Sequence, residues 1–234
     1  MTAIFKRELK AYFSSMLGYV FLTILLLLTG TMFFLYNLTQ KSGSMTNFFA
    51  GTISWVIFIL PILTMRLFSE DRKSKTEQLL LTAPVSLWEI VLGKFLAAFC
   101  VFLIGTAITA LYPIILSFYG KIPLAETISV YVGFILFCGI IISIGAFMSS
   151  LTESQIVAAV ATYGVVVVMV FLNIIAGNIS NPTIAAILTW ISPTARFSDF
   201  TMGVLNLEPI LYYISMIGIF LFLTVRVFEK RRWS

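Results

Sequence analysis

Residues 17–38 read LGYVFLTILLLLTGTMFFLYNL and carry no charged side chain. A helix of about 20 residues crosses the roughly 30 Å hydrocarbon core of a bilayer, so this stretch is long enough to span one. Five further stretches are similarly long and apolar: 48–68, 95–119, 127–149, 156–176 and 208–228. The sequence therefore predicts an all-α integral membrane protein with six transmembrane helices.

The composition supports this assignment. Apolar residues make up 60% of the chain and charged residues 11%, against roughly 45–50% and 25% in ordinary soluble domains. A small soluble domain could not hide this much apolar surface from water. The composition excludes a soluble enzyme, a disordered protein and a free nucleic-acid-binding protein. We expect residues 1–234 to form a single transmembrane domain.

Positive charge is distributed unevenly between the two sides of the membrane. Of the 15 Lys and Arg residues, only Lys41, Lys121 and Arg196 fall in segments opposite the termini, which leaves twelve on the side of the termini. Cytoplasmic segments carry an excess of Lys and Arg. The asymmetry predicts that both termini are cytoplasmic, and it explains the net charge of +5 without a nucleic-acid partner.

The N-terminal residues 1–16 are predicted to form an amphipathic helix. The basic side chains of Lys6, Arg7 and Lys10 share one face. A basic polar face is typical of a helix that lies on the anionic inner leaflet. The alternative is a cytoplasmic extension that does not contact the membrane. Apolar side chains recur at helical spacing on the other face: Phe5, Leu9, Tyr12, Phe13 and Met16.

Two segments between the spans have patterns of their own. Residues 69–94 form the largest predicted cytoplasmic segment, in which we expect a helix, a turn at Pro84 and a second short helix capped by Ser86. Residues 177–207 contain a short apolar stretch bounded by two Xaa-Pro pairs. Proline interrupts helices, so we expect two short helices that enter the outer leaflet and return.

The chain lacks the residues that several kinds of chemistry require. It has no histidine, and Cys100 and Cys138 lie alone in apolar stretches, which is typical of packing residues. It has no phosphate-binding loop of the form GxxxxGK[ST]. No charged residue is expected near the middle of a span, which disfavours a proton-coupled carrier. We therefore expect no catalytic, cofactor or metal site, and an external source of energy.

The residues around the first cytoplasmic segment resemble ABC-2 type transporter permeases. This resemblance is carried by PILTMRLFSEDR at 61–72, TEQLLLTAPVS at 76–86 and WEIVLGK at 88–94. The sequence RELKAYFSS at 7–15, followed by GYV at 18–20, is similar to the gliding-motility-type branch of that family. The resemblance covers the whole chain, from the surface helix to the outer re-entrant pair.

The resemblance implies the fold of ABC-2, or type V, exporters and one half of a transmembrane dimer docked to separate ATPase subunits. Those subunits would bind ATP and Mg²⁺, and the first cytoplasmic segment would be a coupling helix resting in an ATPase cleft. The sequence departs from the motif at Lys75, where glycine is common. The positions that the resemblance assigns to the ATPase contact are Glu70, Arg72, Thr76, Glu77, Leu79, Leu80 and Pro84.

The expected function is the permease subunit of an ATP-driven exporter in the inner or plasma membrane of a prokaryote. Its expected partners are an ABC ATPase, a second permease copy or paralogue, membrane lipid and an extracytoplasmic accessory protein. Two alternatives stay open: a mechanotransmitting or scaffold subunit driven by the same ATPase, and a stand-alone ion-coupled carrier or channel. Small residues in 127–149 and 156–176 allow helices to approach closely, either within the chain, which we favour, or at the seam of a dimer.

Overall fold

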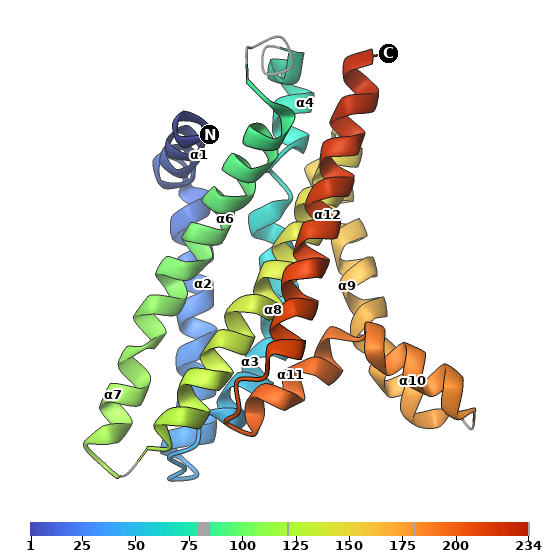
Figure 1. The fold of residues 1–234 in the computed structure, drawn as a ribbon. Helices are drawn as coiled ribbons and strands as arrows, with labels where there is room; N and C mark the ends of the chain where they lie inside the picture. Colours follow the sequence, from blue (N-terminus) through green and yellow to red (C-terminus); the bar gives the residue numbers. More distant parts are fainter. Residues whose placement is uncertain (79–84, 121, 180, 234) are drawn as a thin grey trace.

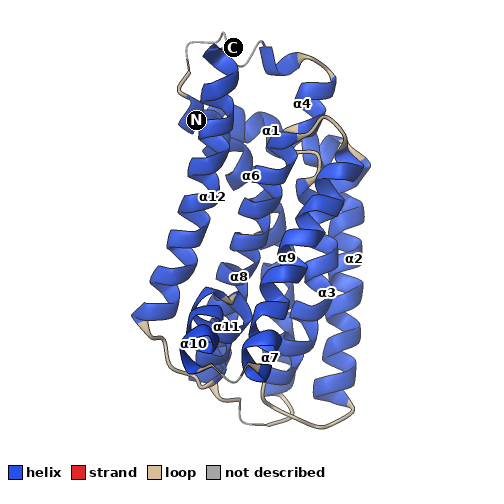
Figure 2. Ribbon diagram, turned by 90° about the vertical axis from the view of Figure 1, so that its right-hand side faces the viewer, coloured by secondary structure: helices blue, strands red, loops and turns tan. Residues whose placement is uncertain are grey.

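The computed structural model describes residues 1–78, 85–120, 122–179 and 181–233, and every regular element among them is helical (Figures 1 and 2). Six helical stretches are long and apolar enough to cross a membrane, which confirms the predicted number of spans. Their bounds are Met16–Leu38, Thr46–Lys73, Leu87–Ser117, Leu124–Leu151, Gln155–Asn178 and Leu207–Arg232.

The long helices lie side by side along one axis, α1, α10 and α11 are inclined to them, and both termini lie at the same end (Figure 1). In chain order the elements are α1 (Thr2–Ser14), α2 (Met16–Phe33), the π-helix η1 (Phe34–Leu38), α3 (Thr46–Thr64), α4 (Ser69–Lys73), α6 (Leu87–Thr109), α7 (Leu111–Ser117), α8 (Leu124–Leu151), α9 (Gln155–Asn178), α10 (Pro182–Ile191), α11 (Pro193–Thr201) and α12 (Leu207–Trp233). We call the end that holds α1 and α4 the terminal end, and the other the distal end.

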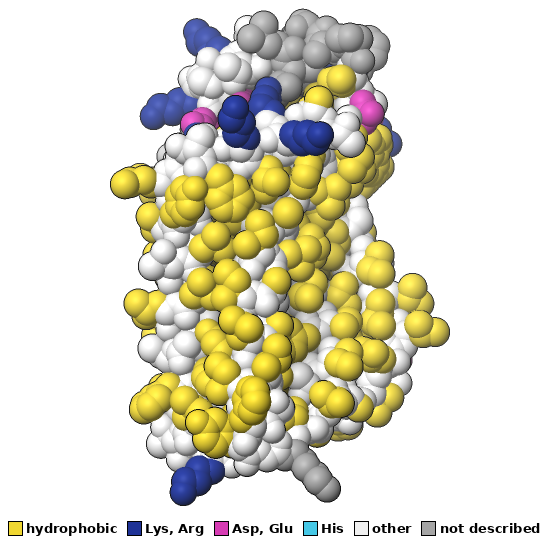
Figure 3. Space-filling model, turned by 90° about the vertical axis from the view of Figure 1, so that its left-hand side faces the viewer, with side chains coloured by type: hydrophobic (Ala, Val, Ile, Leu, Met, Phe, Trp, Pro, Cys, Tyr) yellow, Lys and Arg dark blue, Asp and Glu magenta, His cyan; other side chains and the backbone are white. Residues whose placement is uncertain are grey.

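Helix α8 is the centre of the bundle. It packs against α3, α6, α9, α11 and α12, and its 28 residues would extend about 42 Å, which exceeds the hydrocarbon thickness. A broad belt of apolar side chains covers the face shown in Figure 3, and Lys and Arg gather above it at the terminal end. This distribution is typical of a protein whose middle lies in lipid.

Helix α1 confirms the predicted N-terminal amphipathic helix over most of its length. Tyr12 is buried, and Phe5 and Leu9 pack against the core, where α1 contacts α2 and α6. One predicted member of the apolar face is wrong: Met16 begins α2 and is 83% exposed. The apolar face of α1 thus packs on protein, and its contact with the inner leaflet stays a prediction.

The third span begins earlier than the sequence pattern predicted. Ser86 and Glu89 form a reciprocal capping box that starts α6 at Leu87, so the expected short second helix is continuous with the span. The span is also divided in two, because Pro113 has no N–H for the carbonyl of Thr109. The hydroxyl of Tyr131 donates to that carbonyl at 2.8 Å and so replaces the missing bond.

The two short helices predicted between the fifth and sixth spans are present as α10 and α11. Asn181 caps α10 by accepting from the backbone N–H groups of Thr183 and Ile184 at 3.0 and 3.5 Å. Helix α10 projects away from the bundle and α11 returns to it (orange in Figure 1). The described part of the outer segment therefore contains the two predicted short helices, and their entry into the outer leaflet stays a prediction.

Candidate functional site

The second span is interrupted at the terminal end, within the segment that the sequence assigned to coupling. Helix α3 ends at Thr64 and α4 starts at Ser69, with a turn between them. The hydroxyl of Ser149, on α8, donates to the carbonyl of Met65 at 3.0 Å and accepts from the N–H groups of Phe68 and Ser69 at 3.0 and 3.1 Å. The backbone groups freed by the interruption are therefore satisfied by α8, which holds the turn in place.

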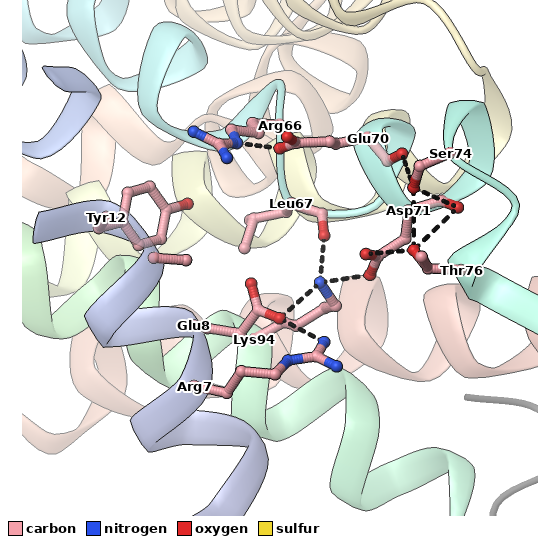
Figure 4. Close-up of a pocket in the computed structure, with 11 residues that line it drawn as sticks. Arg7, Glu8, Tyr12, Arg66, Leu67, Glu70, Asp71, Ser74, Thr76 and Lys94 are labelled. Atoms are coloured by element: carbon pink, nitrogen blue, oxygen red, sulfur yellow. Dashed lines mark hydrogen bonds and ion pairs between the residues drawn. The ribbon is translucent and has the colours of Figure 1, made fainter. Parts of the chain in front are cut away.

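A buried lysine lies directly beneath this turn. Lys94, on α6, is only 2% exposed, and its ammonium group meets three acceptors. These are the carbonyl of Leu67 at 2.7 Å, Asp71 Oδ2 at 2.7 Å and Glu8 Oε1 at 3.1 Å (Figure 4). The contact with Leu67 is a hydrogen bond, and the contacts with Asp71 and Glu8 are ion pairs. Lys94 therefore joins α1, α4 and α6 through a single charge.

Figure 4 shows how α1 completes this cluster. Arg7 Nη2 donates to Glu8 Oε1 at 2.6 Å, so this carboxylate is shared between two cations. The phenol of Tyr12 donates to the carbonyl of Leu63 at 3.0 Å. Burial, and then the negative charge of Glu8, raises the pKa of Tyr12 above its ordinary value, so the phenol keeps its proton. The cluster borders a cavity of about 310 Å³.

Arg72 connects α4 to the turn between the fourth and fifth spans. Its Nε pairs with Glu153 at 2.9 Å, and its Nη1 donates to the carbonyl of Leu151, also at 2.9 Å. The resemblance assigned Arg72 to the contact with an ATPase. The structure uses this guanidinium for a link within the chain, between two segments of the terminal end.

Glu77 is also engaged within the chain. It is 9% exposed, and Oε1 accepts from Arg231 Nη1 at 2.9 Å. Arg231 lies near the C-terminal end of α12 and also donates to the carbonyl of Ser150. This single guanidinium therefore holds together the coupling segment, α12 and the end of α8.

The remaining predicted contact residues are placed differently from one another. Glu70 pairs with Arg66 one helical turn earlier. Thr76 is exposed, and its hydroxyl hydrogen-bonds to Asp71 Oδ1 at 3.0 Å and to the Ser74 hydroxyl at 2.9 Å. Three predicted positions lie outside the described residues: Leu79, Leu80 and Pro84.

Lys75 shows why the related motif commonly has glycine at this point. Its φ angle is 58°, in the left-handed region that side chains with a Cβ rarely adopt. It lies between α4 and the helical residues 76–78, where a chain reversal is needed. The departure from glycine therefore leaves the turn intact, at the cost of some backbone strain.

Sequence reasoning missed most of the cluster around Lys94. Glu8 was assigned to no contact, and Lys94 was placed at the end of the cytoplasmic segment, after the start of a short helix capped by Ser86 and before the third span. One signal could have corrected the second point, because Ser86 and Glu89 have the spacing of a capping box. A helix starting there places Lys94 in its second turn, on a helix that must pack.

A comparison with protein families gives one result for this chain. The family described as ABC-2 family transporter protein matches residues 31–227, which is most of the sequence. This range includes the turn after α3, Lys94 and most of the described elements. A comparison with curated proteins gives no match. The narrower prediction of a gliding-motility-type branch stays a prediction.

Proposed function

This chain belongs to the ABC-2 family of transporter proteins, and we propose that it is the membrane subunit of an ATP-driven exporter. In this proposal a separate ABC ATPase binds ATP and Mg²⁺, and this chain contributes no catalytic residue. A second copy or a paralogue completes the transmembrane pathway between two six-helix subunits. The proposed location is the inner or plasma membrane of a prokaryote. An accessory protein on the outer side is a further proposed partner.

The proposal puts the terminal end in the cytoplasm, where an ATPase could reach it. The positive-inside rule supports this orientation, since twelve of the 15 basic residues were assigned to that side. It brings α4 and the residues after it to the cytoplasmic surface.

The observation that carries the proposal is the way the segment 65–78 is tied to the rest of the bundle. Ser149 links it to α8, Lys94 to α6 and α1, and Arg231 to α12. A movement of this segment would therefore be transmitted to α1, α6, α8 and α12 through short polar contacts instead of through one flexible connection. Such a hub is the arrangement that a coupling element requires.

Two kinds of side chain in this segment should then have different roles. Lys73, Lys75 and Thr76 are exposed and are free to meet a partner. Glu77 and Arg72 are committed to contacts within the chain. We propose that the first group docks the ATPase and that the second transmits its movement.

The test combines co-purification in mild detergent with assays of ATP hydrolysis. Reversing the exposed charges, with Lys73→Glu and Lys75→Glu together, should lower the amount of ATPase that co-purifies, because charges at the rim of an interface steer association. The thermal stability of the permease should not change. The matched control is Lys41→Glu in the distal loop, which should leave co-purification intact. If the double variant retains as much ATPase as the control does, the segment is not the docking site.

A charge swap tests the transmitting group. Glu77→Lys or Arg231→Glu alone should impair cargo-stimulated hydrolysis, and the double variant should recover it because the pair is restored with opposite polarity. A double variant that recovers no activity would contradict a role for the pair between Glu77 and Arg231 in transmission. Stimulation of hydrolysis by a transported solute would favour an exporter over a mechanotransmitting subunit.

A further inference from the structure

A cavity of about 610 Å³ opens at the distal end between α9, α10 and α11. Its volume is within the range of small-ligand sites, roughly 300–1,000 Å³. The wall combines polar and apolar side chains. The lining side chains that matter here are Asn173, Thr189, Trp190, Arg196, Ser198 and Asp199.

Arg196 has unused hydrogen-bonding capacity at this cavity. Its Nη1 donates to Glu208 at 2.7 Å, and its guanidinium lies 5.9 Å from the centre of the Tyr212 ring. Nε is buried, and among the described residues neither Nε nor Nη2 has a hydrogen-bond partner. A buried donor without a partner is costly and calls for an explanation. The Nε–Nη2 edge is the fork that binds phosphate or carboxylate in a bidentate manner.

The rest of the cavity wall offers acceptors. Asp199 follows Arg196 by three residues on α11, lines the same cavity, and makes no side-chain hydrogen bond or ion pair with the described residues. The hydroxyls of Thr189 and Ser198 donate to the carbonyls of Ala185 and Ala195 at 2.8 and 2.6 Å. Their protons are thus used within their own helices, and only their lone pairs are available to a ligand.

These charges select the type of ligand. A simple anion at Arg196 would also face the carboxylate of Asp199, with that of Glu208 on the other side of the guanidinium. A zwitterion avoids this repulsion if its phosphate meets Arg196 and its cation meets Asp199. The acceptor oxygens favour a primary ammonium, which has three N–H donors, over a quaternary ammonium, which has none.

The surroundings indicate where this ligand comes from. Helix α10 has no buried residue, and its apolar side chains Ile184, Ile187 and Trp190 are 47–62% exposed beside the cavity. Tryptophan is enriched where protein meets the headgroup region of a bilayer. We propose that the cavity binds the headgroup of an ethanolamine phospholipid, with its phosphate on Arg196 and its ammonium on Asp199. This inference does not depend on the proposed coupling to an ATPase.

Native mass spectrometry of the full chain can test this assignment. The purified protein is incubated with equal amounts of dioleoyl phosphatidylethanolamine, phosphatidylcholine and phosphatidylglycerol, and the retained lipids are counted. We expect the ethanolamine lipid to be favoured about tenfold, as a charge-assisted hydrogen bond allows. Asp199→Asn should remove that preference, and Arg196→Gln should lower the retention of all three lipids. Unchanged preference in Asp199→Asn would overturn the proposal.

Two further arms make the result specific. The control Lys41→Ala changes an exposed residue of the distal loop that does not line this cavity, so it should keep the preference for the ethanolamine lipid. If Arg196→Gln does not fold, Asp199→Asn still carries the test because it leaves the pair between Arg196 and Glu208 in place. Soluble O-phosphoethanolamine should compete only weakly. If it binds as tightly as the lipid does, the ligand is a soluble phosphorylated amine and the lipid assignment is wrong.

Discussion

The ammonium group of Lys94 lies out of solvent, between two carboxylates and a backbone carbonyl. Taking an ion out of water costs several kcal/mol, and the cost is offset only where its donors all find good acceptors. Here the carbonyl of Leu67 accepts a hydrogen bond at 2.7 Å, and Asp71 and Glu8 pair with the charge at 2.7 and 3.1 Å. These three partners belong to different elements. The charge of Lys94 therefore connects those elements even where its net contribution to the free energy of unfolding is small.

Replacing Lys94 with Met should be strongly destabilising. Two carboxylates would be left facing each other without their shared cation, and breaking a buried pair in this way typically costs about 3–5 kcal/mol. Adding Asp71→Asn should recover much of the loss, because Asp71 pairs with Lys94 whereas Glu8 keeps Arg7 as a partner. Thermal unfolding in detergent measures both effects, with exposed Lys73→Met as the control. Wild-type stability in the single variant would show that the cluster is not a structural joint.

At Lys75 a substitution should stabilise the protein, in contrast to the one at Lys94. A left-handed conformation costs a residue with a Cβ roughly 1–2 kcal/mol, and glycine avoids the steric part of that cost. Lys75→Gly should therefore raise the free energy of unfolding by about 0.5–1 kcal/mol, whereas Lys75→Val should lower it. Denaturant titration of the purified protein distinguishes the two. If glycine is no better than valine, the φ of 58° is not the reason for the glycine in related sequences.

At the scale of elements, the contact between α3 and α8 positions the segment 65–78. Thr64 is fully buried where α3 ends, and Gly145 lies opposite it on α8. One turn further along α8, Ser149 binds the turn that follows Thr64. Close approach of the two helices at Gly145 is therefore the condition for the hydrogen bonds of Ser149.

Gly145→Ala should disturb this contact. The added Cβ would overlap the side chain of Thr64, whose own Cβ would be only 2.6 Å away. Overpacking of this kind costs about 1–3 kcal/mol, and it should also separate Ser149 from the turn. The matched control is Gly164→Ala on α9, where nothing lies within 4 Å of the new methyl group. Thermal unfolding of the two variants should differ, and equal stability would contradict the argument.

For the whole molecule, the sequence predicted what depends on local pattern. Long apolar stretches located the six spans, and the Xaa-Pro pairs located α10 and α11. Contacts between distant residues could not be predicted in this way. Glu8, Asp71 and Lys94 meet only because three helices converge, and a lysine at position 94 looks like an ordinary membrane-edge residue until α6 is known to begin at Leu87.

The residues predicted to contact an ATPase have different environments in the folded chain, and their contact with an ATPase stays a prediction. Charged residues in a loop look alike in sequence, whether they face a partner or one another. Folding separates them: Arg72 and Glu77 turn inward to Glu153 and Arg231, while Thr76 stays exposed. The resemblance to the family motif identifies the segment. The packing of α8 and α12 decides which of its side chains stay accessible to a partner.

The orientation of the bundle decides whether this arrangement can work at all. Cysteines placed at Gln40 and Asn178, both exposed at the distal end, should react with an impermeant maleimide in intact cells. A cysteine at Ser74, exposed beside α4, should react only after permeabilisation, because basic residues concentrate at that end and hold it in the cytoplasm. Cys100 and Cys138 are replaced by Ala beforehand. Labelling at Ser74 in intact cells would put the coupling segment outside the cell, beyond the reach of any ATPase, and would exclude the proposed function.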